Sequence, residues 1–254
     1  MKKFFAIASL LALTLSACAE KEAQGEQQGK GRVDISLVTS AEVVDTRANI
    51  SCTEPAAEDF ALTIEGVGSD YRAEYATLAE FHADSYLRYG SYKATVVAGD
   101  ITDEGYDKAT FAGSAEFAVE ARKHTDVEVT ATIANALVKV ETTESFKNYF
   151  EGYELKLTTA AGNEFDVTAQ SELLFIAPAE FTVSGSAVKQ SAQSGKEGVT
   201  VRLPEFKQSE VAAQTLYTVK MDVEEAGRAT LTITLNETLV ESIDIEQELN
   251  DNAQ

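Results

Sequence analysis

The 254-residue sequence has no tryptophan and only two histidines, two cysteines and three prolines. Two histidines in unrelated segments do not predict a histidine metal centre, and two cysteines exclude a cysteine-based metal cluster. No nucleophile elbow or other motif of nucleophilic catalysis accompanies them. We therefore expect a protein that is not an enzyme and that has no cofactor, no catalytic residues and no metal site.

Basic residues are also scarce, with 21 Lys and Arg against 42 Asp and Glu. A surface with this excess of negative charge repels the phosphates of nucleic acids and of anionic lipid headgroups. Nucleic acid is therefore not an expected partner. Solubility after export is the simplest explanation for the acidity.

Long apolar runs are absent except at the N-terminus, where Lys2 and Lys3 precede the mostly apolar residues 4–15. That run is shorter than the roughly 20 residues of a membrane-spanning helix, and its flanks are typical of a secretory signal peptide. The following "LSAC" (15–18) resembles the lipobox of bacterial lipoproteins. The resemblance implies that residues 1–17 are removed and that Cys18 carries acyl chains, so the membrane becomes a partner. An ordinary signal peptide with a chance cysteine is the alternative.

If Cys18 is acylated, Cys52 is the only remaining thiol and no internal disulfide can form. Residues 18–32 are rich in Gln, Gly and Glu and lack apolar periodicity, which predicts a flexible linker spanning about 20 Å.

From residue 33 onward the apolar residues alternate with polar ones, as in Val33-Asp34-Ile35 and again in residues 127–133. Period-two alternation predicts strands with one buried face, and it favours antiparallel over parallel sheets. The two halves also resemble each other, for example in "DFALTIEG" (59–66) and "GYELKLTT" (152–159). We predict an all-β protein of two tandem antiparallel β-sandwiches, Ig-like or transthyretin-like, at residues 33–134 and 135–254. Chance similarity between strands is the alternative explanation of the repeat.

Three local features are candidate sites, and each has a simpler structural explanation. Asp84 and Ser85 follow His82 closely and are the residue types of a catalytic triad, but no motif of nucleophilic catalysis supports one. His124 lies in a polar turn, where an exposed surface role is expected. The acidic segment "GDITDEGYD" (99–107) supplies oxygens suited to calcium, but it lacks the spacing of an EF-hand loop, so we favour a solvated acidic turn. The tyrosines of "SYLRYGSY" (85–92) can form a glycan-binding platform or pack in the core, and we expect core packing of at least one.

Several segments, including "GRVDISLV" (31–38), "YGSYKATVVAGD" (89–100) and "VEVTATIANALVKVE" (127–141), carry a family resemblance. The chain resembles Bacteroidales-type secreted lipoproteins that are defined by a domain of unknown function and are broadly fimbrillin-like. That resemblance implies two β-sandwich domains, a lipid anchor in the outer membrane and exposure at the cell surface.

The resemblance also gives Arg47 a candidate role, because fimbrillin-type precursors are cut near this position by an arginine-specific protease. Cleavage after Arg47 would remove the strand at residues 33–38, and a neighbouring subunit's strand would fill the open edge. An exposed arginine in a loop between strands is the simpler alternative.

These observations predict a non-catalytic, lipid-anchored surface lipoprotein that acts in adhesion or as a fimbrial-like subunit. Its expected partners are the membrane, reached through acyl chains, and fimbrial-like subunits in homo- or hetero-polymers. A surface glycan or a host ligand is a further candidate partner. The alternative function is that of a glycan-binding accessory lipoprotein in an outer-membrane polysaccharide uptake system.

Overall fold

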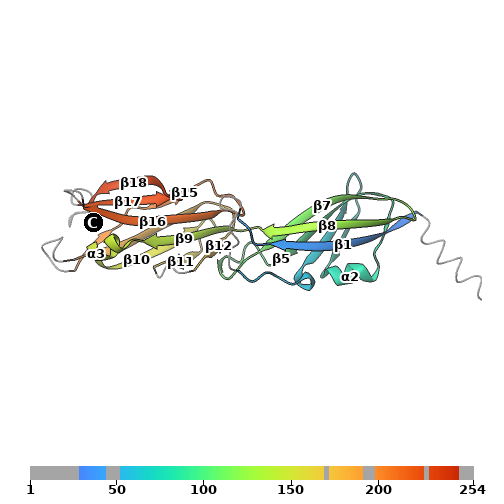
Figure 1. The fold of residues 1–254 in the computed structure, drawn as a ribbon, viewed down its shortest axis with the longest axis horizontal. Helices are drawn as coiled ribbons and strands as arrows, with labels where there is room; N and C mark the ends of the chain where they lie inside the picture. Colours follow the sequence, from blue (N-terminus) through green and yellow to red (C-terminus); the bar gives the residue numbers. More distant parts are fainter. Residues whose placement is uncertain (1–28, 44–51, 169–171, 191–197, 226–228, 246–254) are drawn as a thin grey trace, which may run out of the picture. The chain divides into compact units, whose positions relative to one another are not determined.

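The computed structural model describes residues 29–43, 52–168, 172–190, 198–225 and 229–245. The predicted signal peptide, Cys18, most of the linker and Arg47 lie outside these residues. None of the helices in the described segments has the length and apolar character needed to cross a bilayer. Most of the described residues lie in strands and few lie in helices (Figure 1), which confirms the all-β prediction.

Helices are few and short, as the absence of sustained helical periodicity predicts. They are the 3₁₀ turn η1 (Ala57–Asp59), α2 (Leu78–Ala83) and α3 (Glu144–Tyr149). A threonine caps each α-helix, because the Thr77 hydroxyl accepts a hydrogen bond from Glu80 N and the Thr143 hydroxyl from Phe146 N. These caps satisfy backbone N–H groups that have no partner within the helix.

The described strands form two compact units, each made of three stretches of chain. Unit 1 includes the stretches up to residue 37, 60–96 and 114–129, and unit 2 contains 38–59, 97–113 and the stretch from 130. The tandem boundaries at residues 33–134 and 135–254 remain a prediction.

One seven-stranded sheet has the order β3-β2-β5-β7-β8-β1-β4. Its strands are β1 (Lys30–Ser40), β2 (Ala61–Gly66), β3 (Arg72–Tyr75), β4 (Tyr86–Arg88), β5 (Gly90–Ala98), β7 (Phe111–Val119) and β8 (His124–Ile133). Alternate residues of these strands are buried, as the sequence periodicity predicts, among them Leu62 and Ile64 of β2.

Helix α2 joins the two ends of this sheet in unit 1. It contacts β2 and β3 at one end, and its buried side chains are Leu78 and Phe81. The His82 ring reaches β1, near the other end of the strand order, where its Nε2 lies 3.1 Å from Ile35 O. Because one six-residue helix touches strands from both ends, the sheet must curl around the unit 1 core.

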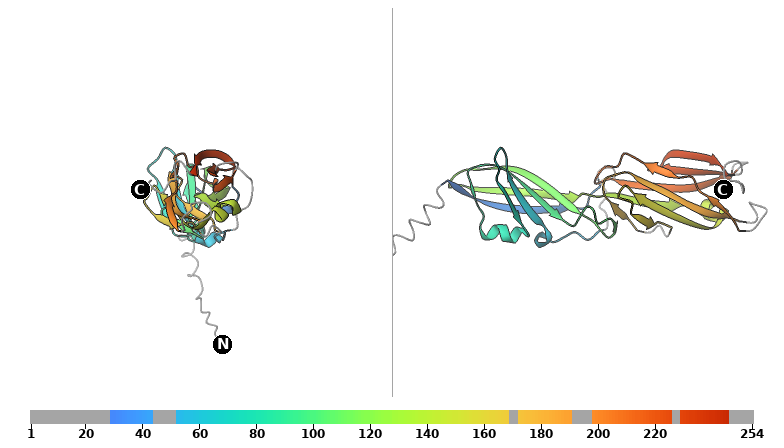
Figure 2. Two further views of the ribbon diagram at one scale, coloured as in Figure 1. Left: turned by 90° about the vertical axis from the view of Figure 1, so that its left-hand side faces the viewer. Right: turned by 180° about the vertical axis from the view of Figure 1, so that it is seen from behind.

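Unit 2 contains two sheets that pack as a β-sandwich (Figure 2). The five-stranded sheet has the order β11-β10-β13-β14, and β15 also pairs with β13. Its strands are β10 (Phe150–Thr159), β11 (Glu164–Asp166), β13 (Phe181–Lys189), β14 (Val199–Arg202) and β15 (Phe206–Gln208).

The six-stranded sheet has the order β18-β17-β16-β9-β12-β6. Its strands are β6 (Gly105–Tyr106), β9 (Ala136–Thr142), β12 (Leu174–Ile176), β16 (Leu216–Glu225), β17 (Ala229–Leu235) and β18 (Thr238–Asp244).

Both sheets contribute side chains to one apolar core, including Leu157 and Val183 from the first and Val219 and Met221 from the second. A core shared by two facing sheets is what defines a β-sandwich. The pairing of β9 with β16 departs from the antiparallel prediction, because these two strands run parallel to each other.

Candidate functional sites

The acidic loop at residues 99–107 is tied into unit 2 by one of its carboxylates. Glu104 Oε2 accepts hydrogen bonds from Thr159 Oγ1 at 2.6 Å and from Asn163 Nδ2 at 2.8 Å. Its Oε1 accepts a third from Ala177 N at 2.9 Å. Glu104 therefore joins three segments, and it departs from the solvated acidic turn that the sequence favoured.

The neighbouring aspartates of this loop have local partners. Asp100 Oδ1 accepts hydrogen bonds from the Thr102 hydroxyl at 2.7 Å and from Thr102 N at 2.9 Å, and these bonds lower the pKa of the Asp100 carboxyl. Asp103 Oδ2 lies 2.7 Å from Lys108 Nζ. The carboxylate oxygens of Asp100 and Asp103 thus bind groups within the loop or next to it.

His82 does not form a catalytic triad. Its Nε2 faces a backbone carbonyl of β1, and among the described residues neither Asp84 nor Ser85 is hydrogen-bonded to its ring. Ser85 is buried, and its carbonyl accepts a hydrogen bond from Val33 N at 2.8 Å. The interaction at Ile35 is instead structural, because it covers a carbonyl on the outer edge of β1.

The described cysteine, Cys52, has the properties of an unreactive thiol. It is free and partly buried. Burial, followed by the charge of Glu54, raises the pKa of the Cys52 thiol, so the nucleophilic thiolate is less populated at neutral pH.

The tyrosine-rich segment divides between the core and the surface. Tyr92 is buried, and its hydroxyl donates a hydrogen bond to Arg88 O at 2.9 Å, which confirms the expected core role of at least one tyrosine. Tyr86 and Tyr89 are exposed. Tyr71 packs edge-on against Tyr92, and burial together with its tyrosine neighbours raises the pKa of Tyr71 to about 12.

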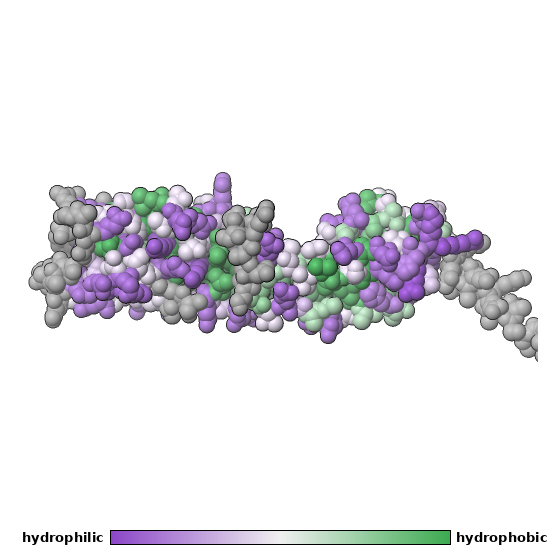
Figure 3. Space-filling model, in the orientation of Figure 1, coloured by the Kyte–Doolittle hydropathy of each residue, from purple (hydrophilic) through white to green (hydrophobic). Residues whose placement is uncertain are grey.

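An open polar groove of about 930 Å³ lies on the five-stranded sheet of unit 2. Hydrophilic residues predominate on the face of unit 2 that is turned toward the viewer in Figure 3. The outward residues of adjacent strands supply hydroxyl, carboxylate and cationic groups to the groove, including Glu154, Lys156, Thr158, Ser184, Ser186 and Arg202. Small serines between longer charged side chains leave a shallow surface rich in hydrogen-bonding groups.

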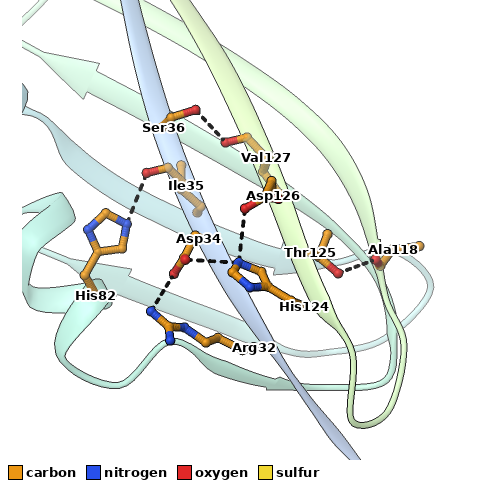
Figure 4. A network of polar contacts seen from close by, with 10 residues as sticks. All are labelled: Arg32, Asp34, Ile35, Ser36, His82, Ala118, His124, Thr125, Asp126 and Val127. Atoms are coloured by element: carbon orange, nitrogen blue, oxygen red, sulfur yellow. Dashed lines mark hydrogen bonds and ion pairs between the residues drawn. The ribbon is translucent and has the colours of Figure 1, made fainter.

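A second polar cluster joins β1 and β8 in unit 1 (Figure 4). His124 Nε2 lies 3.0 Å from Asp34 Oδ2 and 3.1 Å from Asp126 Oδ1. Arg32 Nη2 lies 3.4 Å from the other oxygen, Asp34 Oδ1. The His124 side chain is 49% exposed, so the expected surface position is correct. The sequence did not predict that Asp34 and Asp126 are the partners of His124.

The strand geometry explains why these side chains meet. Residues two apart on a strand lie on the same face, so His124 and Asp126 point the same way from β8. β1 is the neighbour of β8 in the sheet, and Asp34 lies on it beside them. The spacing of a histidine and an aspartate at alternate positions of a predicted strand is the one signal in the sequence that could have identified this cluster.

Comparisons with known proteins give a family and several similar structures. A family model described as "Domain of unknown function (DUF4493)" matches residues 29–251. No functionally curated protein matches the sequence.

The similar solved structures come from Bacteroidales. A candidate polysaccharide-binding protein (DUF1812) of Bacteroides thetaiotaomicron is 10% identical with a TM-score of 0.44, over 87% of this chain and 100% of that chain. A candidate cell adhesion protein of Bacteroides fragilis is 10% identical with a TM-score of 0.39, over 84% and 99%. A candidate cell adhesion protein of Parabacteroides distasonis is 8% identical with a TM-score of 0.44, over 81% and 98%. These TM-scores are too low to carry an assignment of function.

Proposed function

The chain belongs to the DUF4493 family, and we propose that this member is a non-catalytic, lipid-anchored lipoprotein of the outer membrane. It is exposed at the cell surface and acts in adhesion or as a fimbrial-like subunit. The lipobox-like "LSAC" at residues 15–18 supports the anchor, because two or more acyl chains hold a protein stably in a membrane.

The observation that carries the adhesive role is the exposed edge strand β18. It ends the strand order of the six-stranded sheet, and within the described residues its strand partner is β17 alone. Residues 238–242 are all exposed, with Leu239 at 57% and Val240 at 42%. An edge strand offers unpaired backbone groups to a further strand, and exposed apolar side chains strengthen such pairing.

Arg47 adds a second route to strand pairing. Cleavage after this residue would release β1, which lies between β8 and β4 in the strand order. Release would leave β8 as a new edge for the strand of a neighbouring subunit.

The anchor and the surface location are tested on intact cells. We expect the protein to incorporate labelled palmitate and to be digested by protease added outside the cells, because both acylation and exposure are part of the proposal. Cys18→Ser should lose the palmitate label. A chain that is unlabelled, or that protease reaches only after the outer membrane is opened, would contradict the anchor or the location.

The edge strand is tested by association of the purified protein. We expect a double variant, Leu239→Lys with Val240→Lys, to weaken association about tenfold or more, because charge on an edge strand opposes strand pairing. Sedimentation velocity over a range of concentrations measures the effect. Treatment with an arginine-specific protease, with Arg47→Gln as its control, tests the second route.

The matched control for the edge strand is the double variant Val67→Lys with Tyr89→Lys, which adds the same two charges at residues that are 54% and 71% exposed on unit 1. It should associate like the wild type. A wild type that stays monomeric before and after protease treatment would overturn the subunit role.

The groove on the five-stranded sheet favours a second candidate function, that of a glycan-binding accessory lipoprotein of a polysaccharide uptake system. Its hydroxyl and charged groups match the hydrogen-bonding pattern of sugars. Binding to a polysaccharide array that is lost in Arg202→Ala, without concentration-dependent association, would favour this function over adhesion.

A further inference from the structure

The cluster of Asp34, His124 and Asp126 has the geometry of a cation site. One oxygen of each carboxylate and the imidazole Nε2 all lie within 4.8 Å of one another. The two contacts of Nε2 are 3.0 and 3.1 Å long. Zinc binds nitrogen and oxygen ligands at about 2.0–2.2 Å, which places neighbouring ligand atoms of a tetrahedral site about 3.4 Å apart. Small side-chain shifts are therefore enough to bring the three atoms around one ion.

The hydrogen on His124 Nε2 cannot give both neighbouring carboxylates a full hydrogen bond. An imidazole nitrogen holds at most one hydrogen, whether the ring is neutral or protonated. His124 Nε2 nevertheless faces oxygens from two carboxylates. That single hydrogen bonds to one carboxylate oxygen or is shared between both, so the two bonds are not both at full strength. A cation in place of that hydrogen would bind all three atoms at once.

The surroundings fit a metal that accepts nitrogen and oxygen ligands. Arg32 holds the other oxygen of Asp34 and so orients the carboxylate, although its positive charge lowers the affinity for a cation. Beside the cluster lies a hollow of about 320 Å³, to which Ser36 and His82 also contribute. The hollow has room for water molecules that complete the coordination shell.

We infer that Asp34, His124 and Asp126 form a binding site for a divalent transition-metal cation of the zinc type. The ligands are His124 Nε2 and one carboxylate oxygen from each aspartate. The imidazole favours zinc over calcium or magnesium, which prefer oxygen ligands alone. This site departs from the expectation that a histidine metal centre needs both histidines. It does not depend on the proposed function.

The bound ion would link two strands of the same sheet. Asp34 belongs to β1 and the other two ligands to β8. Metal that binds only the folded state stabilises it by an amount that grows with the logarithm of the free metal concentration. Zinc would thus hold β1 against β8.

The test is calorimetric titration of the purified full chain with zinc chloride alone. We expect a site that disappears in His124→Gln and weakens at least tenfold in Asp126→Asn, because each variant removes one ligand. The Asp126 side chain is 89% exposed, so its loss leaves the fold intact. Circular dichroism of each variant without metal verifies this. Calcium chloride in place of zinc should give no binding that depends on His124.

His82→Gln is the matched control, since it changes the protein's other histidine and leaves the three ligands in place. It should bind zinc like the wild type, and any zinc held by thiols appears equally in all variants. Equal zinc binding by the wild type, His124→Gln and Asp126→Asn would overturn the inference. If calcium and zinc both bind equally well to the wild type and to His124→Gln, the cations are held by a diffuse acidic surface. That result would also overturn the inference.

Discussion

Phe146→Ala should lower the free energy of unfolding by about 3–5 kcal/mol, the range for removing a large aromatic side chain from a packed core. Phe146 is fully buried in unit 2. Its ring centroid lies 4.8 Å from that of Phe150 and 5.2 Å from that of Tyr153. Truncation therefore removes apolar contacts and leaves a cavity among aromatic rings. Urea denaturation followed by circular dichroism and tyrosine fluorescence measures the loss.

The control for this prediction lies one residue further along α3. Lys147 is exposed and pairs with Glu144 at 3.0 Å, so Lys147→Ala should leave stability almost unchanged. Equal losses in the two variants would mean that the helix itself, and not the cavity, determines the effect. A loss from Phe146→Ala close to zero would contradict the assignment of this ring to the core.

Glu104→Ala should cost about 2–4 kcal/mol of unfolding free energy, because hydrogen bonds to a charged group contribute more than neutral ones. The change removes the acceptor for Thr159, Asn163 and Ala177 at once. The backbone N–H of Ala177 then loses the side-chain acceptor that it has in the folded protein. Chemical denaturation measures the cost, and amide exchange at Ala177 should accelerate in the variant.

Two further variants separate the role of Glu104 from general loss of negative charge. Glu104→Gln keeps one carbonyl oxygen, so it should retain part of the stability. Asp103→Ala removes a neighbouring carboxylate whose ion pair with Lys108 is exposed, and it should cost under about 1 kcal/mol. A loss in Asp103→Ala as large as that in Glu104→Ala would contradict the bridging role.

The strands could be predicted from the sequence because burial alternates along them. The apolar residues Val219, Met221 and Val223 recur at every second position, and all three are buried in the structure. The choice of partner strand could not be predicted in the same way. Alternation fixes which side of a strand is buried, whereas the parallel pairing of β9 with β16 depends on residues about 80 positions apart along the chain.

The polar sites were harder to predict for the same reason. An exposed position for His124 followed from its polar turn, but its contact with Asp34 joins segments that only the sheet brings together. Glu104 was counted with its acidic neighbours because a short segment cannot show that the partners lie at Thr159 and Ala177. Local sequence thus revealed which residues are polar, and the tertiary fold determined what each one binds.

The hydrogen bonds of Gln214 constrain the order in which parts of the newly made polypeptide can fold. Its Nε2 donates a hydrogen bond to Glu42 O at 2.8 Å, and its backbone N–H donates one to Asn135 O at 2.7 Å. Ribosomes release the N-terminal part of a polypeptide first. More than half of the polypeptide must therefore be made after Glu42 before Gln214 is present to form this hydrogen bond. Until then unit 2 is incomplete, because it combines residues 38–59 with the stretches 97–113 and 130 onward, so its folding ends after most of the polypeptide has been released.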